Sequence, residues 1–464
     1  MRLLSDRIGW LAAAVILFHL VFNAIIPIHL DEAYYWWWSQ RLELGYFDHP
    51  PMIAYLIKLT TLFSDHPFFI RLVPLLSTAG ALYYIYRLSE KIYGIETARI
   101  AALIFLILPT VQVSFTVATP DAPLILFFSA GLYYFYLAYT TEKTRYIYIS
   151  GLLMGLMLLS KLTGIIFWGA FGLFILLKKR AMLRNPHIYL ALLLGVAVNS
   201  GFLYWNSQNE WISFLFQYEH GSSETFHLNL ATLAGYVAGF FAIATPVFAG
   251  LFFYLLVKLR GAWRVQGSDL LLFVTAFILL FFGYKALFKP MLLNWYAPAL
   301  ISLIPFLAYG IVKLTLKKSL YTAAALAVLL SVVTQFPGGI VPPSENPKNK
   351  FYGYEEALER LRPFVKPDSI LCSDHQTHTG MLHYYLNDLP NRKSNILASK
   401  ASMFEIWDKN LPKPKTCLAW VERDNINRHH REACSSITLL DRYVQKHKGL
   451  ADKTFLIFEC EVRP

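Results

Sequence analysis

Charged residues are scarce in this chain of 464 residues, at 16% of the total, whereas hydrophobic residues make up 56%. A soluble globular protein carries about 25% charged residues, so this composition excludes an ordinary soluble protein and indicates an integral membrane protein. The net charge of +12 then reflects basic loops facing anionic lipid rather than a nucleic-acid interface. The sequence also has no internal repeat and no low-complexity tract.

Cysteine is scarcer still. The chain has four, and all of them follow the last hydrophobic run, at Cys372, Cys417, Cys434 and Cys460. They form no CxxC pair, which argues against a zinc site. An even set confined to one part of the chain predicts two disulfides in an oxidising compartment, with three pairings open. Four buried free thiols are the alternative interpretation.

Long hydrophobic runs dominate the first part of the chain. About 20 residues cross a bilayer as a helix, and by that measure we expect about eleven transmembrane helices, including one over 231–257. Two of the predicted helices are short and separated by a break at Ser160–Gly164. No cleavable signal peptide is evident. We therefore expect a polytopic helical membrane domain over 1–336, with helices lying in the membrane interface at about 30–67.

Hydropathy falls sharply at Pro337, and residues 337–464 have an ordinary soluble composition. Most basic residues of the short loops fall on alternate loops, which by the positive-inside rule places the N-terminus in the cytoplasm. With an odd number of spans the C-terminal domain is extracytoplasmic. Its alternating patterns predict a small α/β fold. The expected strands are Ser369–Cys372, Cys417–Val421, Ile437–Leu440 and Thr454–Glu459, and the expected helices are Tyr354–Val365 and Gly380–Leu386.

The most informative segment runs from His29 to Ile53, directly after the first hydrophobic run. It begins with Asp31 and Glu32, continues with a run of Tyr and Trp, and ends with Asp48 beside an imidazole. Carboxylates at a membrane boundary stay near water or a partner, because burying one in hydrocarbon costs several kcal/mol. The segment predicts an acidic site at the membrane surface. Capping of a helix N-terminus is the alternative role for Asp31.

Two further residues could carry chemistry on the same side of the membrane. Asp121 stands in a short turn between predicted spans, where helix capping is again the alternative. Lys161 ends a short span beside a helix break, where an ammonium can bind a lipid phosphate. Snorkelling of Lys161 to the interface is the alternative. We find no Walker, GxGxxG, HExxH or GxSxG motif placed for use, so an activated donor would arrive as a lipid.

Other candidates depend on loops meeting in the fold. Asp48, which is followed by His49, and His220, which follows Glu219, have the chemistry of a divalent metal site. The alternative is that each of these acid–histidine pairs makes hydrogen bonds at the membrane interface. Lys289 and Tyr296 lie in an outside turn and could complete a cradle for an anionic headgroup, together with His49. The aromatic residues of the first long loop are expected to hold a lipid chain.

Four short motifs, in order, resemble a known family. They are Asp31-Glu32, Tyr46–Pro51, Pro120–Leu124 and Leu159–Lys161. Together they are similar to polyprenyl-phosphate-sugar-dependent glycosyltransferases of the GT-C class, the bacterial relatives of dolichyl-phosphate-mannose protein mannosyltransferases, which include the lipid A aminoarabinose transferase. The likeness covers approximately residues 8–315, and an extracytoplasmic C-terminal domain fits the family's architecture.

The resemblance implies roles for individual residues. Asp31 would be the catalytic carboxylate, with Glu32 beside it, and Asp121 a second essential acid. Lys161 would lie near the carrier phosphate. The resemblance also implies that Asp48 and His220 together bind a metal ion. Where the aminoarabinose transferase has a phosphate-binding lysine this chain has His49, so His49, Lys161 or Lys289 would supply the positive charge.

We therefore expect an inverting glycosyltransferase that moves a sugar from a polyprenyl-phosphate donor to a lipid, glycan or protein acceptor on the extracytoplasmic face. A single base suffices for that reaction, whereas retention needs a nucleophile as well. The alternative is a transporter or flippase for a lipid-linked sugar. Transporters commonly place polar groups near the bilayer midplane in two related halves, a pattern that this sequence does not show. The family resemblance implies a Gram-negative inner membrane.

Overall fold

The computed structural model describes residues 7–221, 227–261, 264–337, 340–398 and 400–463, with the side chain of His220 outside the description. It divides into two compact units. One, here called the helical unit, comprises Met1–Asn23, His49–Ile53 and Arg71–Gln335. The other, the sheet unit, comprises Ala24–Asp48, Ala54–Ile70 and Phe336–Pro464. The sequence-based division had placed the loop segments before residue 71 with the membrane domain.

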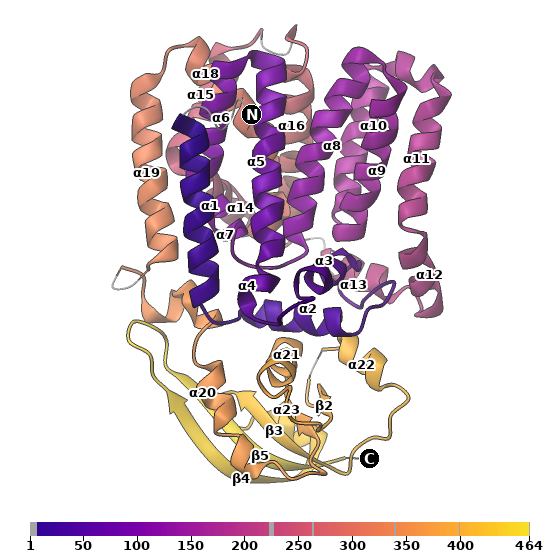
Figure 1. Cartoon of the computed structure of the whole chain (residues 1–464), viewed down its shortest axis with the longest axis vertical. Coiled ribbons are helices and arrows are strands. Elements are labelled where there is room, and N and C mark those ends of the chain that lie inside the picture. The colour runs from indigo at the N-terminus through magenta and orange to yellow at the C-terminus, as the bar shows by residue number, and fades with distance from the viewer. Residues whose placement is uncertain (1–6, 222–226, 262–263, 338–339, 399, 464) are drawn as a thin grey trace. The chain divides into compact units, whose positions relative to one another are not determined.

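The helical unit consists of apolar helices, several of which run alongside one another (Figure 1). Its helices are α1 (Arg7–Ile25), α5 (Leu72–Tyr93), α6 (Ile95–Ile107), α7 (Pro109–Ser114), α8 (Asp121–Thr141), α9 (Thr144–Ser160), α10 (Gly164–Lys178), α11 (Pro186–Val198), α12 (Ser200–Gln208), α13 (Ile212–Gly221), α14 (Leu230–Ala244), α15 (Pro246–Lys258), α16 (Ser268–Ala286), α17 (Leu293–Tyr296), α18 (Ala299–Lys313) and α19 (Lys317–Gln335). One core of apolar side chains joins most of them.

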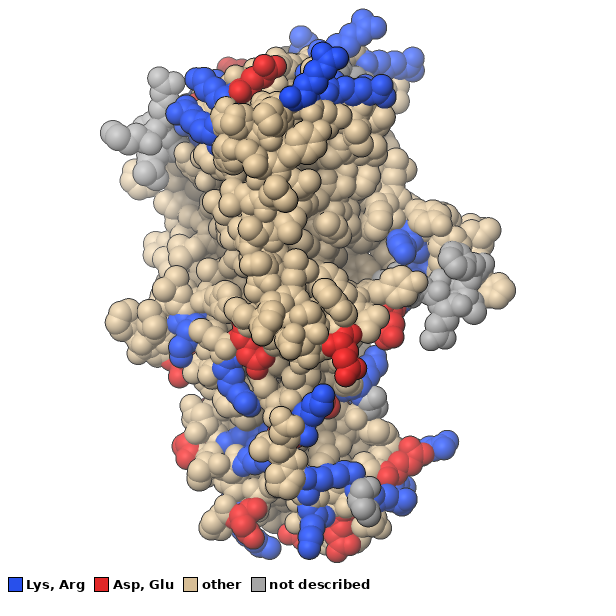
Figure 2. Space-filling model, turned by 90° about the vertical axis from the view of Figure 1, so that its right-hand side faces the viewer, with Lys and Arg blue, Asp and Glu red and all other residues tan. Residues whose placement is uncertain are grey.

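Within the described residues, 5 helices are long and apolar enough to cross a membrane, or up to 7 if each bent pair counts as one span. Three shorter apolar helices accompany them, including α9 and α10, which the break at Ser160–Gly164 separates as expected. On the face shown in Figure 2 the helical unit presents a wide zone without charged side chains, and Lys and Arg gather at one end of it. The protein is thus a polytopic membrane protein. The count of eleven helices stays a prediction.

The span predicted over 231–257 is bent. Helices α14 and α15 meet at an angle of 102°. Pro246 begins α15, and a proline has no N–H with which to continue the preceding helix. Thr245 before it takes a φ of 62°, in the left-handed region that a threonine seldom adopts. Hydropathy does not register this break, because the residues on both sides of it are equally apolar.

The sheet unit has a five-stranded mixed sheet in the order β2-β1-β3-β5-β4. The strands are β1 (Leu371–Cys372), β2 (Lys393–Ser394), β3 (Thr416–Glu422), β4 (Cys434–Gln445) and β5 (Lys453–Val462). Its helices are α2 (Leu30–Gln40), α3 (Met52–Thr60, in this unit from Ala54 on), α4 (Pro67–Ile70), α20 (Tyr354–Glu359), α21 (Gln376–Tyr385), α22 (Met403–Asp408) and α23 (Arg428–Ala433). Strands β1 and β2 are parallel, whereas β3, β5 and β4 pair antiparallel. The predicted α/β class is confirmed.

Helix α2 packs closely on α21, and the approach depends on a glycine. A Cβ atom added to Gly380 of α21 would lie 2.8 Å from the backbone nitrogen of Tyr34. That distance is too short for a non-bonded carbon, so only glycine lets the two helices approach so closely. The packing fixes α2 against α21 within the sheet unit.

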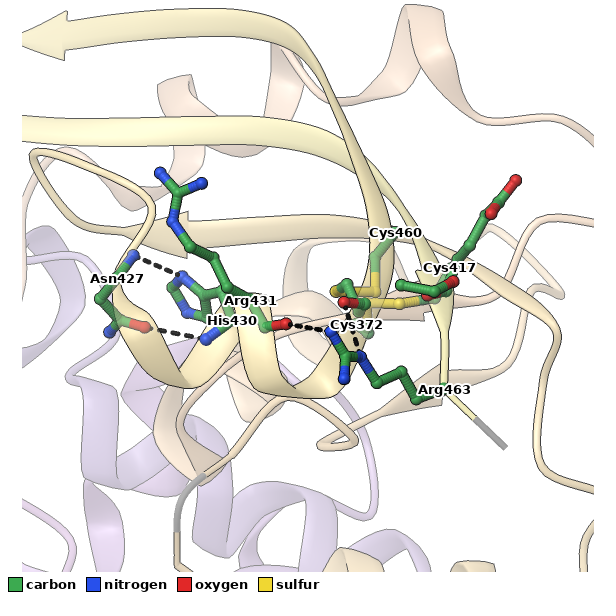
Figure 3. The surroundings of a disulfide bond; sticks show 10 residues. Cys372, Cys417, Asn427, His430, Arg431, Cys460 and Arg463 are labelled. Carbon is green, nitrogen blue, oxygen red and sulfur yellow. Dashed lines mark hydrogen bonds between the residues drawn. A yellow bond between two sulfur atoms is a disulfide. The ribbon is translucent and has the colours of Figure 1, made fainter.

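Both disulfides that the cysteine content predicts are present. Cys372 bonds Cys417 and joins β1 to β3, and Cys434 bonds Cys460 and joins β4 to β5. Figure 3 shows the Arg463 guanidinium beside them, donating hydrogen bonds to the carbonyl oxygens of Cys434 and Arg431. Two crosslinks in one small sheet are typical of a domain that folds in an oxidising compartment.

Candidate active site

The N-terminus of α2 is capped by side chains, and the cap gives the two carboxylates of its first turn, Asp31 and Glu32, different environments. His29 is the capping residue, and its Nδ1 accepts a hydrogen bond from the backbone N–H of Asp31 at 3.1 Å. Glu32 completes a capping box, because its Oε2 accepts the backbone N–H of His29 at 2.9 Å. Glu32 is also fully buried. The structure thus gives Glu32 a capping function.

Asp31 is not the cap that the alternative interpretation of the sequence offered. Its side chain is 40% exposed, and its Oδ2 lies 3.6 Å from His29 Nδ1. That nitrogen already accepts the Asp31 N–H, so it carries no proton there with which to bind the carboxylate. The Asp31 carboxylate therefore keeps lone pairs toward solvent. It is a partly exposed carboxylate in the first turn of a helix that His29 and Glu32 cap.

Most aromatic side chains of the same segment are buried inside the sheet unit. Trp38 and Tyr46 stack with ring centroids 4.2 Å apart, and the Tyr46 hydroxyl donates to the carbonyl of Trp38 at 3.0 Å. Tyr34, Trp36 and Trp38 have almost no exposed surface. The expectation that this loop offers its aromatic rings to a lipid chain is therefore wrong for these residues. They pack against the C-terminal part of the chain, which local sequence cannot reveal.

Asp48 ends this segment of the sheet unit, in an environment that disfavours its charged form. Burial raises the pKa of Asp48 to about 7, assisted by the negative charges of Glu405 and Asp31 and opposed by a hydrogen bond from Tyr34. The negative field there would attract a cation. The His220 side chain lies outside the described residues, and in the described part of the chain no three His, Cys, Asp or Glu side chains form a metal-binding group.

In the helical unit, the buried Lys161 forms an ion pair with the partly exposed Asp121. Lys161 Nζ lies 2.8 Å from Asp121 Oδ1, and the Lys161 residue is only 4% exposed. Asn294 donates a hydrogen bond to Asp121 Oδ2 at 2.9 Å. Both oxygens of Asp121 are therefore held by side chains. The capping role considered for Asp121 is not observed, because Pro120 occupies the cap position of α8 and no side chain caps that helix.

The helix break after α9 positions the lysine. Lys161 is the C-cap of α9 and has extended backbone angles, φ −156° and ψ 137°. The chain then turns back so closely that a Cβ atom on Gly164 would lie 2.8 Å from the carbonyl oxygen of Met157. The turn thus requires glycine. One of the three ammonium N–H groups of Lys161 donates to Asp121, and the other two have no hydrogen-bond partner among the described residues.

The remaining predicted phosphate ligands differ in their exposure. Tyr296 is fully buried and packs against Tyr236 with ring centroids 4.5 Å apart, so its ring stabilises the helical unit. Lys289 is partly exposed and its Nζ lies 3.4 Å from the carbonyl oxygen of Glu219. His49 is half-buried. Asn294, two residues before Tyr296 in the same outside turn of the sequence, contacts Asp121 instead.

Comparison with known proteins identifies the class. Residues 48–205 match the family described as dolichyl-phosphate-mannose-protein mannosyltransferase. The lipid A galacturonosyltransferase RgtD of Rhizobium johnstonii is 25% identical over 377 residues, covering 78% of each chain. The crystal structure of ArnT from Cupriavidus metallidurans superposes with a TM-score of 0.68 at 14% identity, covering 97% of this chain and 98% of that one. The same holds for ArnT bound to undecaprenyl phosphate.

The chain is a GT-C-fold glycosyltransferase. The fold class and the enzyme class expected from the four motifs are thereby confirmed, and the transporter alternative is not supported. The family match begins at Asp48 and includes Asp121 and Lys161, whereas Asp31 precedes it. The family match therefore does not support a role for Asp31, and such a role is argued from its geometry and from the order of the four motifs.

Proposed function

We propose that this GT-C glycosyltransferase is an inverting enzyme that moves a sugar from a polyprenyl-phosphate donor to lipid A or a related envelope glycolipid. The relative from Rhizobium johnstonii is named for action on lipid A, and ArnT has been solved with undecaprenyl phosphate. The reaction is placed on the extracytoplasmic face of the inner membrane, with the N-terminus in the cytoplasm. The two disulfides of the sheet unit support that orientation.

The observation that carries the proposal is the state of Asp31. Its carboxylate is partly exposed, is not used to cap α2, and lies on a helix whose N-terminus is fixed by His29 and Glu32. Asp31 accepts the proton of the acceptor hydroxyl while that oxygen attacks the anomeric carbon. The bond from that carbon to the phosphate oxygen breaks, and the carrier leaves as a phosphate monoester.

The leaving phosphate gains negative charge as the bond breaks, so a cation near it lowers the barrier. Lys161 supplies that charge in the proposal, because its ammonium is buried and retains two N–H donors beyond its bond to Asp121. Asp121 and Asn294 hold the lysine and its partner carboxylate in place. His49 and Lys289 are secondary candidates for the same phosphate. A divalent metal at Asp48 and His220 stays a hypothesis.

The substrates are identified by a transfer assay. Purified protein in nanodiscs is incubated with a panel of undecaprenyl-phosphate sugars and with lipid A, and mass spectrometry follows free undecaprenyl phosphate and extended lipid. Equal amounts of both products, with inversion at the anomeric carbon, support the proposal. Release of undecaprenyl phosphate without extension of any lipid acceptor points to another acceptor class, and retention of configuration contradicts the mechanism.

A further inference from the structure

The sheet unit contains a pocket that the proposed chemistry does not use. Its volume is about 290 Å³, and it opens between the C-terminal end of α2, the segment after α21, and α22. All of its lining residues belong to the sheet unit. They combine aromatic rings, cationic side chains and amides. The lining is Trp37, Arg41, His383, Asn387, Leu389, Pro390, Asn391, Arg392, Lys393, Phe404, Trp407, Asp408 and Leu411.

The environment of Lys393 indicates that its ammonium group binds an anion that is not part of this chain. The residue is only 7% exposed, and its Nζ donates to the carbonyl oxygen of Leu389 at 2.6 Å. No ion pair to its ammonium exists in the described part of the chain. Burial lowers the pKa of Lys393 to about 8, and the charge of Asp388 opposes that shift. A buried ammonium with one hydrogen-bond partner of three is costly unless an anion completes its shell.

Two arginines add to the positive charge. Arg392 is neutralised by Asp408, whose Oδ2 lies 3.1 Å from its Nη2, but its Nε is buried without a hydrogen-bond partner. Arg41 is exposed, and its guanidinium lies over the ring of Trp407 at 4.7 Å. Arg41 makes no ion pair with any residue that the structure describes. The lining thus carries three cations and one carboxylate.

The aromatic residues form the walls. Trp37 stacks on His383 with centroids 3.6 Å apart, and His383 stacks in turn on Phe404 at 5.6 Å. Trp407 stands edge-on to Trp37 at 6.5 Å. The Nε2 atom of His383 is buried without a hydrogen-bond partner. Aromatic faces beside a few convergent polar groups are typical of a ligand pocket, and indole faces bind the C–H faces of sugar rings.

We propose that this pocket binds an acidic sugar of the acceptor, a pyranose that carries a phosphate or a carboxylate. The indoles of Trp37 and Trp407 contact the sugar ring with the surface that His383 and Arg41 leave uncovered, while Lys393, Arg41 and Arg392 bind the anionic group. The inference rests on the proposed function in naming the acceptor as the source of that sugar. The binding chemistry itself follows from the pocket alone.

The position of the pocket along α2 indicates what such binding would do. Asp31 lies in the first turn of α2, and Arg41 follows its last residue. At a rise of 1.5 Å per residue, ten residues of helix separate them by roughly 15 Å. A sugar in the pocket is therefore not the one that reacts at Asp31. It is a second, acidic unit of the acceptor that holds the molecule on the rigid helix carrying the base.

The test measures binding and transfer separately on the full-length protein in nanodiscs. The probes are N-acetylglucosamine 1-phosphate, glucuronic acid, neutral N-acetylglucosamine and inorganic phosphate. Isothermal titration calorimetry measures the affinity of the protein for each probe. We expect saturable binding of at least one acidic sugar, with neutral sugar and inorganic phosphate each binding at least 10-fold more weakly. Arg41→Gln and Lys393→Met should each weaken that binding at least 10-fold, whereas the exposed control Lys446→Gln should not.

Transfer kinetics and competition then identify the source of the sugar. The acceptor lipid should displace the acidic probe, the undecaprenyl-phosphate sugar should not, and Arg41→Gln should raise KM for the acceptor with kcat nearly unchanged. Displacement by the donor alone would overturn the assignment to the acceptor. Equal affinity for inorganic phosphate, or unchanged binding in Arg41→Gln and Lys393→Met, would overturn the sugar site.

Asp31→Asn makes the two proposals distinguishable. This variant should bind the acidic probe as the unaltered protein does, even if it transfers no sugar. Binding lost in Asp31→Asn would overturn the separation of the pocket from the base. Arg41 is exposed, so Arg41→Gln keeps the test decisive if the buried Lys393→Met fails to fold.

Discussion

The ammonium of Lys161 lies 2.8 Å from Asp121 Oδ1, and the other oxygen of Asp121 accepts a hydrogen bond from Asn294. The relationship joins the end of α9 to the start of α8 and to α17. It places a positive charge in the helical unit with little exposed surface and with donors to spare. A buried pair of this kind depends on both partners, since removing one leaves the other charge uncompensated.

Removing the lysine should therefore cost both stability and activity. Breaking a buried ion pair from one side costs up to about 3–5 kcal/mol, less where one partner is partly exposed as Asp121 is. We expect Lys161→Met to lower the thermal midpoint, and Lys161→Met with Asp121→Asn to recover much of that loss. Neither the single nor the double variant should catalyse sugar transfer at the rate of the unaltered protein. Full activity in the double variant would contradict a phosphate-binding role for Lys161.

The contribution of His378 to the stability of the sheet unit should fall as pH rises above 6.5. Burial alone would lower the pKa of His378, but its interactions with Asp374 and Glu422 outweigh burial and raise the pKa. A raised pKa contributes stability that is complete below the unfolded value of 6.5 and is lost as pH rises through the folded value. Thermal unfolding between pH 6 and 9 should show this decline.

His378→Gln should flatten that decline, whereas His227→Gln, at an exposed position of the helical unit, should leave it unchanged. Asp374 shifts in the opposite direction: its interactions with His378, His430 and Arg423 lower its pKa despite burial. Its contribution is therefore present above pH 4 and is lost only in stronger acid. A pH profile identical in His378→Gln and the unaltered protein would show that this network does not set the slope.

Reduction should destabilise the sheet unit. Each disulfide closes a loop, of 45 residues for Cys372–Cys417 and 26 residues for Cys434–Cys460. Loops of this length are worth about 2–4 kcal/mol each by the chain-entropy account, and the longer loop about 0.5 kcal/mol more. The Cys372→Ala, Cys417→Ala pair should therefore lower the unfolding midpoint slightly more than the Cys434→Ala, Cys460→Ala pair. A midpoint insensitive to dithiothreitol would argue that the bonds are not formed.

Periodicity predicted the sheet unit well. Three of the four expected strands lie within β3, β4 and β5, the fourth overlaps the shorter β1, and the two expected helices overlap α20 and α21. Strand β2 was missed, because Lys393-Ser394 is two residues long and has no alternation to read. The break between α9 and α10 was also visible, as glycine follows a polar pair there. Pro246 marks the bend at Thr245 in the sequence, but hydropathy passed over it because apolar residues flank it on both sides.

Candidate site residues were predicted by type and by position relative to the membrane, and that information has limits. It selected Asp31, Asp121 and Lys161 as candidates, because their charges are costly in hydrocarbon. It could not show that Glu32 caps α2 or that Tyr296 is fully buried, since both depend on partners chosen by the fold. The pocket at Lys393 joins segments more than 300 positions apart in the sequence and leaves no local signal.

The most direct test compares two neighbouring carboxylates on α2. Asp31→Asn removes the proposed base, and Glu32→Gln keeps the shape and the capping ability of the buried residue beside it. Single-turnover release of undecaprenyl phosphate in the presence of lipid A measures the chemical step for each variant. The account predicts a loss of at least about 100-fold in Asp31→Asn, the size typical of a general base, and little change in Glu32→Gln. Unimpaired turnover by Asp31→Asn would contradict it.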